Sequence, residues 1–177
     1  IQALNMGYDL MKQQVTNVNG DFTLENGSGH PHLYMIGNDA IGLGAIAAGS
    51  RFMSAYPITP ASEIMEYMIA NLPKVDGTVV QTEDEIINTQ RGGPSTGLPT
   101  KQEQSDLMQM IYGTHGDIPK IVVAPTDAED AFYLTMEAFN LAEEYQCPVI
   151  LLSDLQLSLG KQTVKTLDYN KIDIRRG

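Results

Sequence analysis

The residues best suited to chemistry form a stiff loop, Tyr56-Pro57-Ile58-Thr59-Pro60, that joins a short apolar run to a helical pattern. Thr59 is predicted to be the helix N-cap and Pro60 the first helical residue. The free NH groups of such a helix start attract an anion, and a nearby hydroxyl can orient a carboxylate. The loop therefore predicts a small-acid site at the carboxyl end of a strand, where open α/β sheets bind ligands.

A second candidate loop begins with Arg91-Gly92-Gly93 and continues to residue 100. The forked guanidinium of Arg91 could bind an anion, and the two glycines would let the backbone approach a ligand closely. A solvated arginine on a surface loop is the alternative. The length of the loop favours function. His115, in a Gly-rich loop at residues 113–117, is a further candidate with less support.

Three other patterns have plainer explanations. Glu83 directly follows an expected strand and is the best placed of three acidic residues to enter a cleft, although a solvated acidic turn explains them more simply. Residues 42–47 match a dinucleotide-binding fingerprint, but the glycines fall inside a helical segment, so close helix–sheet packing is favoured. His30 and His32 lie in a linker without further ligands, which does not favour a metal site.

Composition excludes several classes of function. A net charge of -11 argues against nucleic acid and against anionic membrane surfaces as partners. No apolar run reaches membrane-spanning length, and no signal peptide is visible. Cys147, the single cysteine, can form no internal disulfide and cannot hold an iron–sulfur cluster. These features predict a cytoplasmic protein.

Strand and helix patterns alternate along the chain and predict an α/β fold with a doubly wound parallel sheet. Residues 1–32 are expected to be a linker from a preceding domain, residues 33–159 the domain, and residues 160–177 a linker to a following one. Strands are expected at 33–36, 52–56, 77–81, 121–124 and 148–153. Helices are expected at 40–48, 62–72, 102–112 and from Thr126 or Asp127 to residue 145.

Taken together, these segments resemble the alpha subunit of 2-oxoacid:ferredoxin oxidoreductases, most closely the 2-oxoglutarate type. The resemblance covers most of residues 33–159. Its pieces are Gly37-Asn38-Asp39-Ala40, Tyr56-Pro57-Ile58-Thr59-Pro60, Gln81-Thr82-Glu83-Asp84-Glu85, Asn88-Thr89-Gln90-Arg91-Gly92-Gly93-Pro94-Ser95-Thr96-Gly97, the run 101–107 and the loop 112–116.

The resemblance implies the pyrimidine-binding domain of a thiamine-diphosphate enzyme. Glu83 would be the glutamate that hydrogen-bonds the aminopyrimidine ring of the cofactor, with Pro57 and Ile58 beside it. Thr59 and Arg91 would contact the carboxylate or carbonyl of a small 2-oxoacid, and Tyr56 would line the same pocket. These roles agree with the independent interpretation of both loops as anion sites.

The implied reaction is oxidative decarboxylation of a 2-oxoacid to an acyl-coenzyme A, with electrons passed to ferredoxin. A beta subunit would share the thiamine diphosphate and would carry the Mg2+ and [4Fe-4S] cluster whose motifs this chain lacks, so the enzyme is expected to be a hetero-oligomer. 2-Oxoglutarate is favoured, with pyruvate and branched 2-oxoacids left open. Lys101 is a candidate for the distal carboxylate of a diacid.

One departure from the family pattern lies at residues 86–88. The family continues there with a helix, a strand and a Ser-Gly-Pro-Gly loop, whereas this sequence joins its two motifs directly. Parallel strands need a crossover of about a dozen residues or more, so the fold is expected to be incomplete. Two alternatives remain open: a non-catalytic subunit-assembly module, and the pyrimidine domain of another thiamine-diphosphate enzyme such as a transketolase-like one.

Overall fold

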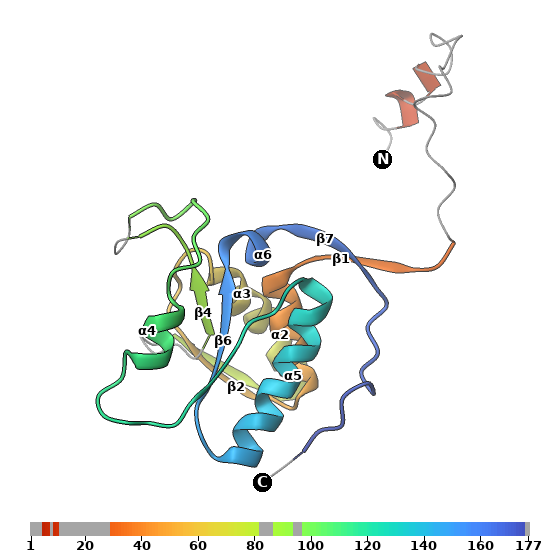
Figure 1. Ribbon diagram of the computed structural model, residues 1–177. Helices are drawn as coiled ribbons and strands as arrows, with labels where there is room; N and C mark the ends of the chain where they lie inside the picture. Colours follow the sequence, from red (N-terminus) through yellow and green to blue (C-terminus); the bar gives the residue numbers. More distant parts are fainter. Residues whose placement is uncertain (1–4, 8, 11–28, 82–86, 94–96, 176–177) are drawn as a thin grey trace. The chain divides into compact units, whose positions relative to one another are not determined.

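The computed structural model describes residues 5–7, 9–10, 29–81, 87–93 and 97–175 (Figure 1). The chain divides into two compact units, Ile1–Pro31 and His32–Gly177. In the first unit the described residues 5–7 and 9–10 are helical. The second unit contains all the strands described below. Glu83 lies outside the described residues, and its assignment remains a prediction.

Parallel strands form two separate sheets among the described residues. β2 (Phe52–Ala55) pairs with β3 (Thr78–Gln81), and β6 (Val149–Asp154) is flanked by β4 (Ile87–Gln90) and β5 (Ile121–Val123). The pairing is parallel in each case. The fold is thus of the predicted α/β class with parallel strands, divided into a two-stranded and a three-stranded sheet. β4 was not expected.

The apolar sequence of β6, Val-Ile-Leu-Leu, explains its central place. Its residues 149 and 151–153 are buried, as is usual for a parallel strand covered on both faces. β2 differs, because Phe52 at its start is 62% exposed.

Helices surround the sheets in the order α2 (Gly37–Ala47), α3 (Ser62–Asn71), α4 (Leu107–Tyr112), α5 (Ala128–Tyr145) and α6 (Leu155–Leu159), with a 3-10 turn η2 (Leu72–Val75). Asp127 caps α5, since its carboxylate accepts a hydrogen bond from the Asp130 NH at 2.8 Å. The prediction of a cap at 126 or 127 is confirmed. No helix in the described part of the chain has the length and apolar character needed to cross a membrane.

α2 forms the centre of the core because its small residues let two helices approach. A Cβ on Gly42 would lie 2.7 Å from the Tyr67 ring of α3, and one on Gly44 would lie 2.5 Å from the Phe132 carbonyl of α5. Close packing is therefore the role of these glycines, as predicted, but it is against helices and not against a sheet. Ile41 and Phe132 are fully buried at this contact.

β1 (His32–Ile36) does not join the parallel sheets. It pairs antiparallel with β7 (Lys161–Lys165), with Leu33 opposite Val164. The segment expected as a linker from residue 160 therefore contains a strand, and Val164 and Leu167 belong to the hydrophobic core. Its polar composition hid this because only alternate side chains turn inward.

Candidate functional site

The loop after β2 turns before the helix begins. The NH groups of Ala61 and Ser62 both donate to the Ile58 carbonyl, at 2.7 and 3.1 Å, which closes a turn ahead of α3. The N-cap of α3 is Ala61, without a side-chain cap bond. The prediction of Thr59 as N-cap and Pro60 as first helical residue is therefore wrong. This turn, with a cis Thr59–Pro60 peptide bond, delays the helix by two residues.

Arg91 and Thr59 meet although they are 32 residues apart. The Arg91 guanidinium donates a hydrogen bond to the Thr59 carbonyl. Thr59 follows β2 and Arg91 follows β4, so the carboxyl ends of these strands lie at the same edge. Two residues that the sequence suggested separately as anion ligands thus form one site. Arg91 is half-buried and Thr59 is exposed.

The rest of the loop offers an apolar surface beside that cation. Tyr56 is 45% exposed and Ile58 is 37% exposed, with exposed Pro57 between them. Exposed apolar side chains of this size next to a guanidinium suit a ligand with both a flat ring and an acidic group.

Asn38 holds this loop from below, a role that the sequence reasoning missed. It is fully buried at the start of α2. Its Nδ2 donates to the Pro60 carbonyl at 2.6 Å and to Glu63 Oε2 at 3.2 Å. Its Oδ1 is buried and has no hydrogen-bond partner among the described residues. A polar residue within an otherwise small and apolar helix start was the available signal.

Two carboxylates lie near this anchor. Partial burial, and then the charge of Glu63, raise the pKa of Asp39 above its ordinary value, while a backbone hydrogen bond from Ile36 acts the other way. The two acidic groups thus repel each other beneath the loop. A nearby cationic or hydrogen-bond-donating group would relieve that repulsion.

The loop that follows Arg91 is fastened to itself. The Gly92 NH donates to the Lys101 carbonyl at 2.7 Å, and the Leu98 NH donates to the Gly92 carbonyl at 2.8 Å. The Gly93 NH donates to Glu103 Oε2 at 2.8 Å. Lys101, the candidate for a distal carboxylate, is exposed at the base of this loop.

Residues 102–106 were expected to be helical but are not. The Gln102 side chain accepts from the Gln156 NH at 2.8 Å, and the Gln104 side chain donates to Asp154. Asp106 is held by β4, since its NH donates to the Gln90 side chain at 2.9 Å. These contacts draw the segment away from helical geometry, so that α4 begins only at residue 107.

Asp154, at the carboxyl end of β6, receives several donors. Partial burial acts to raise its pKa, but hydrogen bonds from the Leu157 NH, from Gln104 and Gln102, and from the Gln156 NH outweigh burial and hold the pKa below its ordinary value. Asp154 therefore stays ionised and fixes α6 and the 102–106 segment.

His115 is not brought to the site loops by any contact that the structure gives. It lies exposed in the turn after α4. Among the residues that the structure describes, no group of three or more His, Cys, Asp or Glu side chains is placed to hold a metal ion.

These features define an α/β domain whose parallel strands carry an anion-binding pair of loops at their carboxyl ends. Residues 43–87 and 86–176 match the family described as pyruvate flavodoxin/ferredoxin oxidoreductase, thiamine diphosphate-binding. The chain belongs to this family, as its motifs predicted.

Known relatives agree with this assignment. The 2-oxoglutarate synthase subunit KorA of Methanothermobacter thermautotrophicus is 37% identical over 188 residues, which cover 81% of this chain and 50% of that protein. Subunit alpha of 2-oxoacid:ferredoxin oxidoreductase 1 of Aeropyrum pernix is 34% identical, covering 80% of this chain and 30% of that one. The chain spans about half the length of the KorA relative.

A solved structure shares the fold. The 2-oxoglutarate:ferredoxin oxidoreductase of Magnetococcus marinus, with 2-oxoglutarate, coenzyme A and succinyl-CoA bound, has a TM-score of 0.87 and 36% identity to this chain. The match covers 99% of this chain and 38% of that one.

Proposed function

We propose that this chain is the pyrimidine-binding part of the alpha subunit of a 2-oxoacid:ferredoxin oxidoreductase. The reaction would be oxidative decarboxylation of a 2-oxoacid to an acyl-coenzyme A, with electrons passed to ferredoxin. The observation that carries the proposal is the hydrogen bond from Arg91 to the Thr59 carbonyl. It joins the two loops that the family motifs assign to the substrate, in a chain that belongs to the family.

The residues at the strand ends fit thiamine diphosphate. The exposed apolar surface of Tyr56, Pro57 and Ile58 suits the face of a pyrimidine ring. The family match and the motif position together support Glu83 as the carboxylate that hydrogen-bonds that ring. When bound, the cofactor supplies a carbon nucleophile for the carbonyl of a 2-oxoacid.

The chain's own residues would bind and orient the substrate. Arg91 already spends one guanidinium NH on the Thr59 carbonyl, which fixes the plane of the fork and leaves its other NH groups for a carboxylate. The Thr59 hydroxyl would donate to the carboxylate or carbonyl beside it. Asn38 would hold the loop in place through Pro60.

A partner subunit is supported by the apolar surface of α4. Its six residues, Leu-Met-Gln-Met-Ile-Tyr, include none that is buried. Met108 is 63% exposed and Tyr112 is 71% exposed. Apolar residues gathered on one exposed helix indicate a protein contact. The beta subunit would cover this helix and supply the Mg2+ site and the [4Fe-4S] cluster.

The substrate proposed is 2-oxoglutarate, with pyruvate as the alternative. Relatives named 2-oxoglutarate synthase support the diacid. Lys101 would bind its distal carboxylate. Lys101→Gln should then raise the KM for 2-oxoglutarate while leaving the KM for pyruvate unchanged. An equal effect on both substrates would rule Lys101 out.

The test of function compares two arginines in the full-length alpha subunit assembled with its beta subunit. Arg91→Lys should raise the KM for the 2-oxoacid about 10- to 100-fold, since lysine cannot keep the fork that binds a carboxylate. Arg51→Lys is the matched control, because Arg51 also donates to backbone carbonyls, at Ser50 and Ile46, but at the amino end of β2. Equal, small effects of both variants would overturn the proposal.

The cofactor assignment has its own test. Glu83→Gln should lower kcat by about two orders of magnitude or more while leaving the alpha–beta assembly intact on size-exclusion chromatography. Full activity of this variant would favour the alternative, a non-catalytic assembly module. Turnover that needs neither ferredoxin nor coenzyme A would favour another thiamine-diphosphate enzyme.

A further inference from the structure

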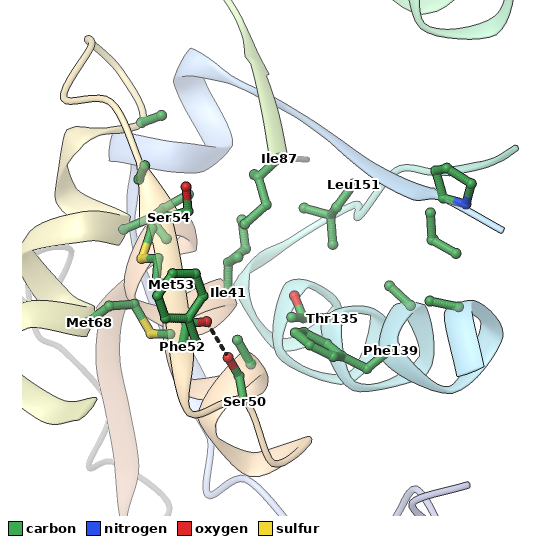
Figure 2. Close-up of a pocket in the computed structure, with 18 of the residues that line it drawn as sticks. Ile41, Ser50, Phe52, Met53, Ser54, Met68, Ile87, Thr135, Phe139 and Leu151 are labelled. Carbon is green, nitrogen blue, oxygen red and sulfur yellow. Dashed lines mark hydrogen bonds between the residues drawn. The ribbon is translucent and has the colours of Figure 1, made fainter. Parts of the chain in front are cut away.

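An apolar groove separates the two parallel sheets. It holds a volume of about 480 Å³ and is lined by β2, β4, β6, α2 and α5 (Figure 2). Met53 and Ala55 lie on its β2 side, Ile87 on its β4 side, and Leu151 and Phe139 on β6 and α5. Neither β3 nor β5 contributes. The groove thus follows the edge of β2 and the edge of β4.

Both of these edges are unpaired among the described residues. β2 pairs with β3 on one side, and β4 pairs with β6 on one side. Their carboxyl ends lie together, because Arg91 after β4 reaches the carbonyl of Thr59 after β2. The two strands therefore run in the same direction, and a strand placed between them could pair in parallel with both.

Chain length supports an absent segment. The M. thermautotrophicus alignment extends over 188 residues and half of that relative, yet it uses 81% of the 177 residues here, which is about 143. The relative therefore has about 45 residues more in the same span. The family match breaks into two pieces at residues 86–87, which is where β3 and β4 follow each other.

The direct connection between β3 and β4 is short for parallel strands. Only the five residues 82–86 separate Gln81 from Ile87. A parallel crossover with its helix takes at least about 10–12 residues. A complete strand–helix–strand unit takes about 30 or more. A segment of about 45 residues has room for a strand, a helix and their loops.

Two buried polar atoms agree with a missing neighbour. Asn38 Oδ1 on α2 and Thr89 Oγ1 on β4 have no hydrogen-bond partner within the described ranges. Buried polar atoms are nearly always paired. α2 and β4 both border the groove.

We propose that the groove between β2 and β4 is the seat of one parallel β-strand. The strand belongs to a segment of about 45 residues that the KorA relatives carry and that this sequence omits at residues 86–87. With the strand in place, the two sheets become one sheet in the order β3-β2-new strand-β4-β6-β5. The proposal concerns architecture and does not depend on the enzymatic reaction.

Insertion of the segment tests the proposal directly. The corresponding segment of the M. thermautotrophicus relative would be placed between Ile86 and Ile87 of the 177-residue chain. Amide hydrogen exchange of β2 and β4 is then expected to slow at least tenfold, binding of an apolar dye is expected to fall, and the Tm is expected to rise. The same segment inserted at Gly116, where no atom lies within 4 Å of an added Cβ, is the control and should produce none of these changes.

A second measurement covers an insertion that misfolds. The segment supplied as a synthetic peptide should raise the Tm of the unmodified chain, and a scrambled peptide should not. Ile87→Lys, which puts a charge in the groove, should abolish that rise. The proposal is overturned if β2 and β4 exchange as fast with the segment as without it. It is equally overturned if light scattering shows that a second copy of the chain already covers these edges.

Discussion

The carboxyl ends of β6 and β2 show two different states of the same fold. At β6 the strand is paired on both edges, and Asp154 receives enough hydrogen bonds to stay ionised despite partial burial. At β2 one edge is unpaired, Asn38 Oδ1 lacks a partner among the described residues, and Asp39 repels Glu63. The β6 side is complete within this chain. The β2 side carries the proposed substrate loop and leaves groups for a ligand, a partner subunit and a missing strand.

The largest expected effect contrasts a side chain from each sheet. Leu152 of β6 is 5% exposed and Phe52 of β2 is 62% exposed. Leu152→Ala should lower the free energy of unfolding by about 2–5 kcal/mol, since it removes buried methyl groups and leaves a cavity. Phe52→Ala should cost less than about 1 kcal/mol. Urea denaturation measures both.

Restoring the missing segment should change this contrast. Phe52 lines the groove, so the cost of Phe52→Ala should rise once a strand covers it. The cost of Leu152→Ala should stay the same. If Phe52→Ala already costs as much as Leu152→Ala in the 177-residue chain, the β2 side is not open and the comparison fails.

The next effect concerns α2, which joins the two sides. Gly44→Ala would place a Cβ 2.5 Å from the Phe132 carbonyl, and this backbone atom cannot move without shifting α5. The expected loss is about 1–3 kcal/mol, which exceeds the gain of about 1 kcal/mol from the better helix propensity of alanine. Thermal unfolding followed by circular dichroism measures the change.

Gly93→Ala is the control for that substitution. A Cβ there would have its nearest neighbour at 4.0 Å, the Glu103 carboxylate. Its effect on Tm should be close to zero. A stabilising effect of Gly44→Ala would show that α2 and α5 are less closely packed than the structure describes.

Asn38→Ala should have an intermediate effect on stability and a specific effect on binding. It leaves the Pro60 carbonyl without its 2.6 Å donor, at a cost of about 1–3 kcal/mol. In the assembled enzyme it should raise KM more than it lowers kcat, because the loop that orients the substrate loses its anchor. Thr135→Val is a matched control, since it removes a buried 2.6 Å hydrogen bond to the Ala131 carbonyl inside α5. A similar change in KM for both variants would contradict a positioning role for Asn38.

Elements set by local sequence were predictable, and those set by distant contacts were not. β6, with its continuous apolar run, and α5, with its Asp127 cap, were both expected. β7 was missed because its strand pairing depends on β1, some 130 residues earlier in the chain. Residues 102–104 read as helical, but their side chains bind Gly93, Asp154 and Gln156.

The candidate site divides in the same way. That Thr59 and Arg91 would both serve an anion followed from residue type and from their places after strands, since carboxyl ends share one edge. The delayed start of α3 and the Asn38 anchor required three-dimensional contacts across more than 20 residues. Glu83 remains a prediction from its motif.

The smallest expected effect is a difference in sign between Asp154 and Asp39. The pKa of Asp154 is lowered in the folded chain, so its stabilisation is present above the ordinary value of 3.8 and is lost as the pH falls through the folded pKa. The pKa of Asp39 is raised, so its ionisation destabilises the fold at neutral pH, and this penalty disappears as the pH falls below 3.8. Asp154→Asn should therefore lower the Tm at pH 7, whereas Asp39→Asn should raise it. Each change should be smaller than about 1 kcal/mol because both carboxylates are partly exposed to solvent. Both differences should shrink toward pH 3, and Tm measured from pH 3 to pH 7 would show it. Shifts of the same sign for both variants would mean that the two strand ends do not differ as the structure describes. A ligand or partner that donates to the β2 side should reverse the Asp39→Asn effect and leave that of Asp154→Asn unchanged.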